Sequence, residues 1–422
     1  MKNAATRGQP RATAEIASMI LGRAPHAVVL SGPGSVGKTT LALDLAAGLL
    51  CSAPDPAARP CRACRGCHLV ASGNHPDLYR LAPEGPGGQI VIGAAQHPEP
   101  GTVRYLISQL ALLPVEGGAR VAIVEQAHRM NDAAQNALLK MLEEPPAGVT
   151  IVLCSDDDEC LLPTVRSRCV RVRLGVVGTR EIEAWLGELG VADAPQAARL
   201  ARVAGGRPGL ALAYARSPEA ERIRGEIARG LVDLLPAGRQ ARLAAIRDLL
   251  KSAASLDASL SAGRRAGAVG DEADTPVRAR GRKGKGAAPA LQDDQAADIA
   301  PDEPSAPKVS AADKRAAAAT LLEIWASVGR DLAVARSGGA RQLRELGQLN
   351  ELRAIAPALA AGAVEAFLAR LAETDAALDE NANSELALDV LVLGWPNVES
   401  SAAARAGTGS AAPAGATGSP RE

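Results

Sequence analysis

The stretch GPGSVGKTT, residues 32–40, has the residue types and spacing of a loop that binds phosphate. Gly32, Gly37, Lys38 and Thr39 fit the pattern G-x-x-x-x-G-K-[ST]. Such glycines let backbone N–H groups converge on phosphate oxygens, the lysine adds positive charge, and the threonine hydroxyl is a ligand for Mg²⁺. We therefore predict a nucleotide site, with ATP and Mg²⁺ as candidate ligands, rather than a glycine-rich turn without a ligand. Its loop residues are Gly32, Pro33, Gly34, Ser35, Val36, Gly37, Lys38, Thr39 and Thr40.

A second chemical feature is the segment VAIVEQAHRM, residues 121–130, in which an apolar run ends at Glu125 and Gln126. Hydrolysis of ATP needs one acid to hold Mg²⁺ and usually a second acid to polarise water. Here Glu125 has the place of the first acid, and the amide of Gln126 has the place of the second. An amide orients a water but cannot accept its proton, and loss of a general base typically costs about 10²–10⁴ in rate. The sequence therefore predicts a nucleotide site with impaired hydrolysis.

The segment CSAPDPAARPCRACRGCH carries Cys51, Cys61, Cys64 and Cys67, and the last three have the spacing C-x-x-C-x-x-C. A loop with this spacing can wrap a cation, and Cys51 completes a tetrahedron from the end of the preceding helix. Four thiolates make a closed, structural Zn²⁺ site. An iron–sulfur cluster is the competing ligand, and His68 is interpreted as a bystander that could replace one thiolate. The other cysteines are interpreted as small core or strand-edge residues: Cys154, Cys160 and Cys169.

Short apolar runs separated by helical patterns must position these residues. Runs rich in Val and Ile predict strands at 26–31, 120–125, 149–154 and 169–174. Between them, residues 131–144 repeat apolar side chains at helical spacing, and two prolines end that helix. Strands separated by helices favour a parallel sheet with helices on its faces. The predicted fold class is therefore α/β, with the phosphate loop between the first strand and a helix.

The rest of the chain is helical or low in complexity. From about 178 to 250 the pattern is helical only, and a second helical block spans about 313 to 396. Between these blocks, residues 253–312 have few large apolar side chains and a basic stretch followed by an acidic one, so we predict disorder. The basic stretch RARGRKGKG is interpreted as a solvated linker, with a DNA contact as the alternative. The tail from 399 is also predicted to be disordered.

Composition limits the classes of protein. Lys and Arg together number 47, as do Asp and Glu, so no net charge steers the chain toward nucleic acid or membranes. No run approaches about eighteen consecutive apolar residues, and the first residues lack the pattern of a secretion signal. In a reducing compartment, the seven cysteines are expected to be thiols or metal ligands. We therefore expect a cytoplasmic protein without a membrane span.

The order of these motifs resembles that of a known family. The phosphate loop, the four cysteines and the degenerate acidic strand are joined by HPDL at 75–78, QNALLKMLEEPP at 135–146 and SRC at 167–169. This set is similar to the clamp-loader subunits of bacterial DNA polymerase III, which are of the AAA+ class. The resemblance covers about 8–245 well and 313–396 more weakly.

The resemblance implies an AAA+ P-loop domain with an inserted zinc module, a small helical lid domain and an all-α collar for oligomerisation. The boundaries are 1–177 for the P-loop domain, 51–68 for the zinc module, 178–252 for the lid, 253–312 for the insertion, 313–398 for the collar and 399–422 for the tail. It also implies partners: gamma/tau and delta subunits in a hetero-pentameric ring, a sliding clamp, and primed DNA bound through the assembled complex. Lys140 is a candidate DNA contact, with a solvated helix face as the alternative.

Two kinds of subunit in this family matter here. The gamma/tau kind hydrolyses ATP, whereas the delta-prime kind carries the Ser-Arg-Cys triplet and tends to have lost hydrolysis. Gln126, the segment around the triplet and ENANSELALDVLVLGWP at 380–396 favour the delta-prime kind. The resemblance then implies that the chain helps to load the clamp, and that Arg168 serves as an arginine finger at a neighbouring ATPase. Such fingers are worth about 10³–10⁵ in rate; a surface salt bridge is the alternative for Arg168.

Two departures from the family pattern concern the nucleotide. Ser155 has the place of a polar sensor, but the carboxylate of Asp156 would repel a γ-phosphate. In the lid, the register of Arg207 is shifted by one, and Pro208 has the place of the arginine that senses nucleotide. The rival functions are a gamma/tau-type ATPase subunit, a P-loop small-molecule kinase and a zinc-dependent DNA-binding regulator. The kinase would leave the zinc module and the C-terminal helices unexplained.

Overall fold

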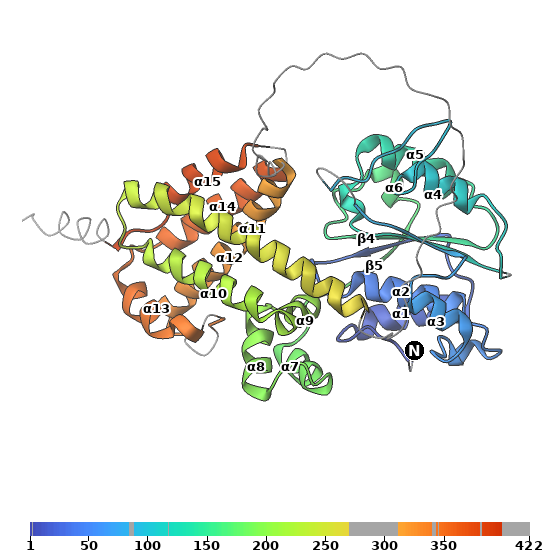
Figure 1. Cartoon of the computed structure of the whole chain (residues 1–422), viewed down its shortest axis with the longest axis horizontal. Coiled ribbons are helices and arrows are strands. Elements are labelled where there is room, and N and C mark those ends of the chain that lie inside the picture. Colours follow the sequence, from blue (N-terminus) through green and yellow to red (C-terminus); the bar gives the residue numbers. More distant parts are fainter. Residues whose placement is uncertain are drawn as a thin grey trace, which may run out of the picture.

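The computed structural model contains an α/β region and an all-helical region, which Figure 1 shows side by side. The residues described are 1, 3–83, 88–116, 118–269, 311–339, 343–344, 346–379 and 382–398. The predicted tail over 399–422 and most of the predicted insertion lie outside these residues.

A five-stranded parallel sheet forms the centre of the α/β region, with the strand order β2-β3-β4-β1-β5. The strands are β1 (Ala27–Ser31), β2 (Leu78–Leu81), β3 (Arg120–Val124), β4 (Val149–Ser155) and β5 (Val170–Arg173). All residues of β1, β3 and β4 are buried, as is typical of parallel strands covered on both faces. The four predicted strands are confirmed. The edge strand β2 is not among them, because its short sequence LYRL mixes apolar and charged side chains.

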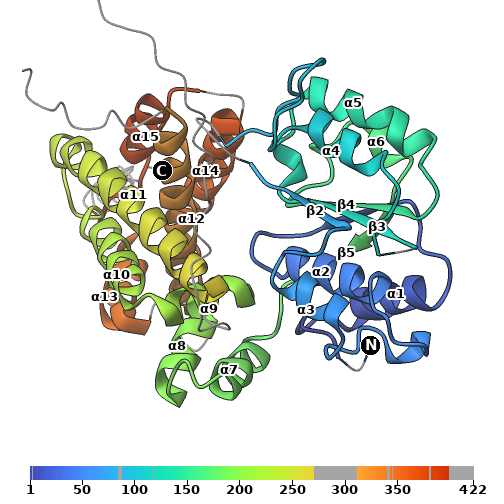
Figure 2. The ribbon, with the colours of Figure 1, turned by 45° about the vertical axis from the view of Figure 1, so that its right-hand side comes forward.

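Helices cover both faces of the sheet (Figure 2). On one face lie α1 (Pro10–Leu21), α2 (Lys38–Leu49) and α3 (Arg65–Ala71), and on the other lie α4 (Val103–Leu110), α5 (Asp132–Glu143) and α6 (Pro163–Arg166). Within β1, Val28 and Leu30 pack in the core that contains α1 and α2. The alternate residues Ala27 and Val29 pack in the core that contains α4 and α5. The predicted α/β class, with helices on the faces of a parallel sheet, is therefore confirmed.

The helical region begins with a small group of three helices, α7 (Thr179–Glu188), α8 (Ala194–Val203) and α9 (Pro208–Arg216). The helical bundle that follows contains α10 (Pro218–Asp233), α11 (Arg239–Val269), α12 (Ala311–Arg336), α13 (Leu349–Ile355), α14 (Ala363–Asp379) and α15 (Ser384–Leu393). Helices α10 and α11 pack against α12 and also against α9, so the lid predicted over 178–252 shares a core with the later helices and its boundary stays a prediction. Ser217 separates α9 from α10 along the chain.

Helix α11 also corrects the predicted start of the disordered insertion at 253. It continues to Val269, and its residues Ala253, Leu256 and Leu260 are buried. These residues recur at helical spacing, but the surrounding sequence is rich in small side chains, so its composition alone indicates disorder. A long alanine-rich helix is stable here because α12 covers one of its faces.

Among the described residues, no single helix is long and apolar enough to cross a membrane. One bent pair, Leu349–Ala358 with Ala363–Leu378, passes the test by length and composition only. Phe367 of this pair lies in the core of the bundle, where its ring centroid is 5.2 Å from that of Trp325 and 4.5 Å from that of Trp395.

Candidate functional site

The predicted phosphate loop lies between the end of β1 and the start of α2, which begins at Lys38. Gly32 has φ 147° and Gly37 has φ 105°, conformations that L side chains rarely adopt. A Cβ atom on Gly32 would also lie 2.2 Å from the carbonyl oxygen of Leu174. The backbone of this turn therefore requires the glycines of the motif.

Lys38 is the buried cation of this loop, with 7% of its surface exposed. Its Nζ donates hydrogen bonds to the carbonyl oxygens of Gly32 (2.5 Å) and Pro33 (2.7 Å). The same atom forms an ion pair with Oδ1 of Asp156 at 2.7 Å, and Asp156 comes directly after β4. The sequence marks Asp156 as a residue that would repel a phosphate, and the structure places that carboxylate against the lysine of the motif.

The acidic strand ends in a second internal ion pair. Glu125 follows β3, and Nε and Nη2 of Arg80 both donate to its Oε1, at 2.9 and 2.6 Å. Arg80 lies on β2, whose pairing with β3 brings it to the end of that strand. Gln126 is exposed and has a left-handed backbone with φ 50°. Arg80 is not among the predicted site residues, because its strand β2 has the short sequence LYRL, in which a charged side chain lies between apolar ones.

Ser155, the candidate polar sensor, is a buried residue at the end of β4. Its hydroxyl donates a hydrogen bond to the carbonyl oxygen of Asp157. The backbone N–H of Asp156 donates to Nδ1 of His128 at 3.1 Å, which joins the end of β4 to the turn after β3. The serine and the histidine therefore both stabilise the turn that carries Asp156.

The small helical group contacts the phosphate loop at Ser35. The N–H of Gly209, near the start of α9, donates to the carbonyl oxygen of Ser35 at 3.0 Å. Arg207, the shifted lid arginine, forms an ion pair with Glu323 of α12. Pro208 is the first residue of α9, a position where its missing N–H is tolerated. The arginine beside the loop is therefore held by the helical bundle.

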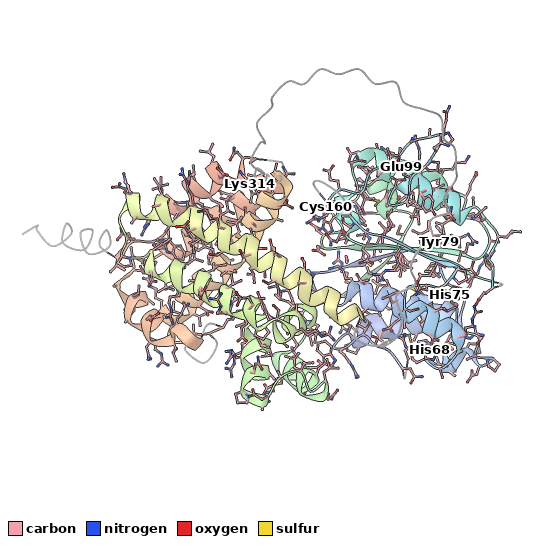
Figure 3. The ribbon with its side chains drawn as sticks, in the orientation of Figure 1. His68, His75, Tyr79, Glu99, Cys160 and Lys314 are labelled. Carbon is pink, nitrogen blue, oxygen red and sulfur yellow. The ribbon has the colours of Figure 1, made fainter. Side chains whose placement is uncertain are left out.

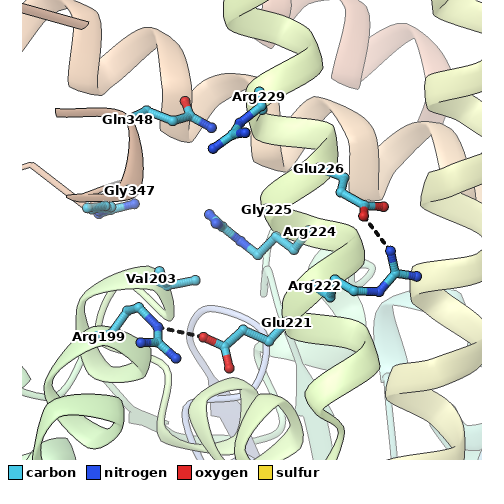
Figure 4. A pocket seen from close by; sticks show the side chains of 11 residues that line it. Arg199, Val203, Glu221, Arg222, Arg224, Gly225, Glu226, Arg229, Gly347 and Gln348 are labelled. Atoms are coloured by element: carbon cyan, nitrogen blue, oxygen red, sulfur yellow. Dashed lines mark hydrogen bonds and ion pairs between the residues drawn. The ribbon is translucent and has the colours of Figure 1, made fainter. Parts of the chain in front are cut away.

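Two cavities lie near this contact. One, of about 400 Å³, is lined by Ser35 of the loop together with helical residues. The other, of about 370 Å³, lies between α8 and α10, and Figure 4 shows Arg224, Arg229 and Gln348 around it. Arg344 lines both cavities, and burial followed by repulsion from neighbouring arginines lowers its pKa. None of the predicted site residues lines the second cavity.

The four predicted metal ligands come together in space. The Sγ atoms of Cys51, Cys61, Cys64 and Cys67 all lie within 4.8 Å of one another. His68 does not belong to this group and lies exposed on α3 (Figure 3). The loop and α3 therefore gather four thiols, as the spacing predicts, without the histidine.

Backbone N–H groups favour negative charge on these sulfur atoms. Those of Ala53 and Cys61 donate to Sγ of Cys51, both at 3.5 Å, and that of Cys67 donates to Sγ of Cys64 at 3.4 Å. Burial opposes the thiolate of Cys64, but hydrogen bonds, first that from the backbone of Cys67, lower its pKa to about 5. Burial and the neighbouring thiols raise the pKa of Cys67 to about 12. A dication bound at the centre would favour the thiolate form of all four.

The four-cysteine module is tied to the helix that follows the phosphate loop. Asp44, on α2, is fully buried and accepts hydrogen bonds from the backbone N–H groups of Ala5 (3.0 Å) and Thr6 (2.9 Å). It also forms an ion pair with Arg62, which lies between two of the cysteines. One carboxylate therefore joins the N-terminal segment, the four-cysteine module and α2.

Arg168 precedes β5, whereas the phosphate loop follows the neighbouring strand β1, so the two lie at opposite ends of these parallel strands. Strand β5 runs parallel to β1 with Val170 beside Val28, so Arg168 is level with the start of β1, whereas the loop follows its end. At about 3.3 Å per residue, these positions are roughly 20 Å apart along the strand. The Nη2 atom of Arg168 forms an ion pair with Oε1 of Glu143 at 2.6 Å, and Nη1 donates to the carbonyl oxygen of Thr164 at 2.9 Å. The guanidinium therefore cannot reach the chain's own loop.

The two candidate ligand sites differ in how well their residues fit. Four thiols around one centre fit Zn²⁺, which takes four sulfur ligands in structural sites. The phosphate loop has the backbone for a nucleotide, but Lys38 is neutralised by Asp156 and Glu125 is neutralised by Arg80. The lysine and the carboxylate that would hold ATP with Mg²⁺ are therefore already paired within the chain.

Comparison with known families matches residues 8–177 to the family described as DNA polymerase III, delta subunit. Over 195 residues the chain is 38% identical to DNA polymerase III subunit delta' of Pseudomonas aeruginosa. The α/β region is delta-prime-like. The resemblance that the motifs indicate is therefore confirmed for this region.

The delta-prime-like region has further relatives. Over 185 residues it is 35% identical to DNA polymerase III subunit gamma/tau of Mycobacterium tuberculosis, covering 43% of this chain and 30% of that protein. The match to the Pseudomonas protein covers 45% of this chain and 56% of the relative, so the chain spans about half the length of that relative. A solved gamma subunit-related protein of Thermotoga maritima covers 90% of this chain and 97% of its own, at 16% identity and a TM-score of 0.35, which is too low to define a common fold.

Proposed function

We propose that this chain is a delta-prime-type subunit of the DNA polymerase III clamp loader. In this proposal it helps to place a sliding clamp on primed DNA in the cytoplasm, within a hetero-pentameric ring that contains gamma/tau and delta subunits. The similarity of its α/β region to delta' proteins supports the proposal. The helical bundle would be the collar through which the subunits assemble. DNA would be contacted through the whole ring, because this chain carries equal numbers of basic and acidic residues, 47 each.

The observation that carries the mechanism is the position of Arg168. Its side chain is 35% exposed, it is anchored by Glu143 and Thr164, and it lies far from the chain's own phosphate loop. An arginine finger stabilises the charge that develops on a transferred phosphoryl group, and it can be supplied by a neighbouring protein. Arg168 would therefore act in trans, at the nucleotide site of the next subunit.

The chain's own nucleotide site would contribute little hydrolysis. Gln126 has no carboxylate to accept a proton from water, and the charges of Lys38 and Glu125 have internal partners. The four cysteines would hold a structural Zn²⁺ that stabilises the region around α3 and takes no part in a reaction. The chain would thus support catalysis at a neighbouring site.

Arg168→Ala tests this role in a ring reconstituted with gamma/tau and delta subunits. We expect the ring to assemble, as measured by size-exclusion chromatography, and ATP-driven clamp loading to fall at least tenfold, because a finger is worth about 10³–10⁵ in rate at its own site. Arg166→Ala, on the neighbouring helix α6, is the matched control and should leave loading unchanged. Normal loading with Arg168→Ala would show that this arginine is only part of a surface ion pair.

A gamma/tau-type ATPase is the second candidate, and the 35% identity to a gamma/tau subunit favours it. Turnover of ATP by the purified chain, without partner subunits, separates the two functions. The delta-prime proposal predicts turnover close to the background rate, whereas a gamma/tau-type subunit would hydrolyse ATP readily. A Lys38→Ala variant controls for a contaminating ATPase, because it removes the lysine of the phosphate loop.

A further inference from the structure

Two internal ion pairs occupy the charged groups with which a phosphate loop holds a nucleotide and its metal ion. Lys38 is the cation for the outer phosphates, and its Nζ is 2.7 Å from Oδ1 of Asp156. Glu125 is the carboxylate for the metal ion, and its Oε1 accepts two hydrogen bonds from Arg80. Each internal partner has the same sign of charge as the ligand group it would compete with. Asp156 resembles a phosphate in charge, and Arg80 resembles a metal cation.

The carboxylate of Asp156 lies against the loop as well as beside Lys38. A Cβ atom on Gly34 would be 3.3 Å from Oδ2 of Asp156, while Oδ1 contacts the lysine. The turn that carries Asp156 is fixed by its own N–H bond to His128 and by the hydroxyl of Ser155. A phosphate that approached Lys38 would have to displace this carboxylate or remain close to a like charge. Because the side chain of Asp156 is 48% exposed, displacement into solvent is open to it, so it competes with the phosphate without blocking it.

The pair between Arg80 and Glu125 is set by the pairing of two strands. Arg80 lies beside Ile123 in the ladder between β2 and β3, and Glu125 is the residue just after β3. The Arg80 side chain is 43% exposed and that of Glu125 is 20% exposed, so both solvent and a ligand can reach the pair. A metal ion at Glu125 would have to replace a guanidinium that already neutralises the carboxylate.

We propose that Asp156 and Arg80 are internal counter-ions that give this phosphate loop a low affinity for nucleotide with Mg²⁺. Asp156 competes with the phosphates for Lys38, and Arg80 competes with the metal ion for Glu125. The inference goes beyond the proposed function, because it concerns the chain's own loop and requires no partner subunit. It also separates two roles: Asp156 weakens binding with or without Mg²⁺, whereas Arg80 weakens binding only when Mg²⁺ is present.

Calorimetric titration of the purified full chain with ATP, in Mg²⁺ and separately in EDTA, tests both roles. Asp156→Asn should tighten ATP binding at least about tenfold under both conditions, because it removes a like charge beside the phosphates. Arg80→Gln should tighten binding several-fold in Mg²⁺ and leave binding in EDTA unchanged, because Glu125 is freed for the metal. The double variant should show both gains.

Matched controls make the same charge changes at residues outside the pairs Lys38–Asp156 and Arg80–Glu125. Asp157→Asn alters the neighbouring residue, whose carboxylate accepts the N–H of Glu159 at 2.8 Å. Arg173→Gln alters an arginine with a 75% exposed side chain. Neither control should change the dissociation constant for ATP. Adding Lys38→Ala to Asp156→Asn should remove the gain, because the gain depends on a free lysine.

Circular dichroism checks whether each variant is folded. If Asp156→Asn is unstable, Asp156→Ser removes the same charge and takes its place. The proposal is overturned by a wild-type chain that binds ATP with Mg²⁺ as tightly as the variants do. It is equally overturned by Asp157→Asn giving the same gain as Asp156→Asn. Neither result affects the role proposed for Arg168, which is measured through the neighbour's turnover in the assembled ring.

Discussion

The four-cysteine module and the phosphate loop lie at the two ends of helix α2. The groups around the first favour the charge that a ligand would bind, whereas a group beside the second neutralises it. At one end, backbone N–H groups point at the sulfur atoms of Cys51 and Cys64, which favours thiolates that a metal ion can bind. At the other end, Asp156 neutralises Lys38, the charge that a phosphate would bind. A motif thus specifies the backbone of its own loop, whereas the ion pairs of that loop, and in our proposal its affinity, depend on side chains from other strands.

Removal of the metal should produce the largest effect, because a bound dication would balance the negative charge of the four thiolates. We expect the purified chain to contain a single zinc ion. Cys67→Ala, which removes a ligand that is 1% exposed, should lose this ion and lower the free energy of unfolding by more than about 3 kcal/mol, because metal binding contributes directly to folding. Elemental analysis and thermal unfolding measure the two changes.

Cys160→Ala is the control, because Cys160 is exposed and lies outside the group of four thiols. It should keep both the zinc content and the melting temperature of the wild type. Iron and absorption of visible light in the purified chain would instead indicate an iron–sulfur cluster, and a metal-free wild type of full stability would contradict the zinc site.

Arg62→Ala should have an intermediate effect on stability, because it removes the ion pair that joins the four-cysteine module to Asp44 of α2. It leaves the carboxylate of Asp44 buried with fewer partners, although the N–H groups of Ala5 and Thr6 remain. We expect a loss of about 1–3 kcal/mol in the free energy of unfolding, below the value for breaking a fully buried pair because the Arg62 side chain is 30% exposed. Chemical denaturation measures this loss, and zinc content should not change.

Arg65→Ala is the matched control for this link. Its side chain is 77% exposed and pairs with Glu116 at the surface, so the change should stay within about 0.5 kcal/mol. Equal losses from the two variants would show that the ion pair with Asp44 contributes no more than a surface pair. Loss of zinc with Arg62→Ala would show that this pair serves the metal site.

Local spacing explains which parts of the site the sequence predicts. The glycines at positions 32 and 37 adopt backbone conformations that their motif requires, and the strand and helix on either side follow from short apolar runs. The four cysteines lie in one loop and the helix after it, so their convergence also depends on neighbouring residues. Each of these features can be read from a short window of sequence.

The ion pairs of Asp156 and Arg80 cannot be predicted from a short stretch of sequence, because they depend on which strands are neighbours in the sheet. Ser31 lies beside Ser155, so the loop after β1 meets Asp156 only because β4 is the neighbour of β1. The sequence shows that Asp156 is unfavourable for a phosphate, but it does not show which cation the carboxylate contacts. The C-terminal part of helix α11 is also hard to predict. Its residue Ala253 is buried in the packing of α11 against α12, which lies far along the chain. The role of Arg80 is harder still to predict, because the sequence LYRL of its strand β2 gives only a weak signal for a strand.

Among Cys67→Ala, Arg62→Ala and Asp156→Asn, the last should have the smallest effect on stability. Its side chain is 48% exposed, and Lys38 keeps its bonds to the carbonyl oxygens of Gly32 and Pro33, so the loss should be below about 1 kcal/mol. Thermal unfolding without nucleotide measures this loss, with Asp157→Asn as the control. Addition of ATP with Mg²⁺ should then raise the melting temperature of Asp156→Asn more than that of the wild type, because a ligand that binds the folded state more tightly stabilises it more. A loss of unfolding free energy as large as that of Cys67→Ala would mean that the fold of the loop depends on Asp156. The contrast between the two ends of α2 would then not hold.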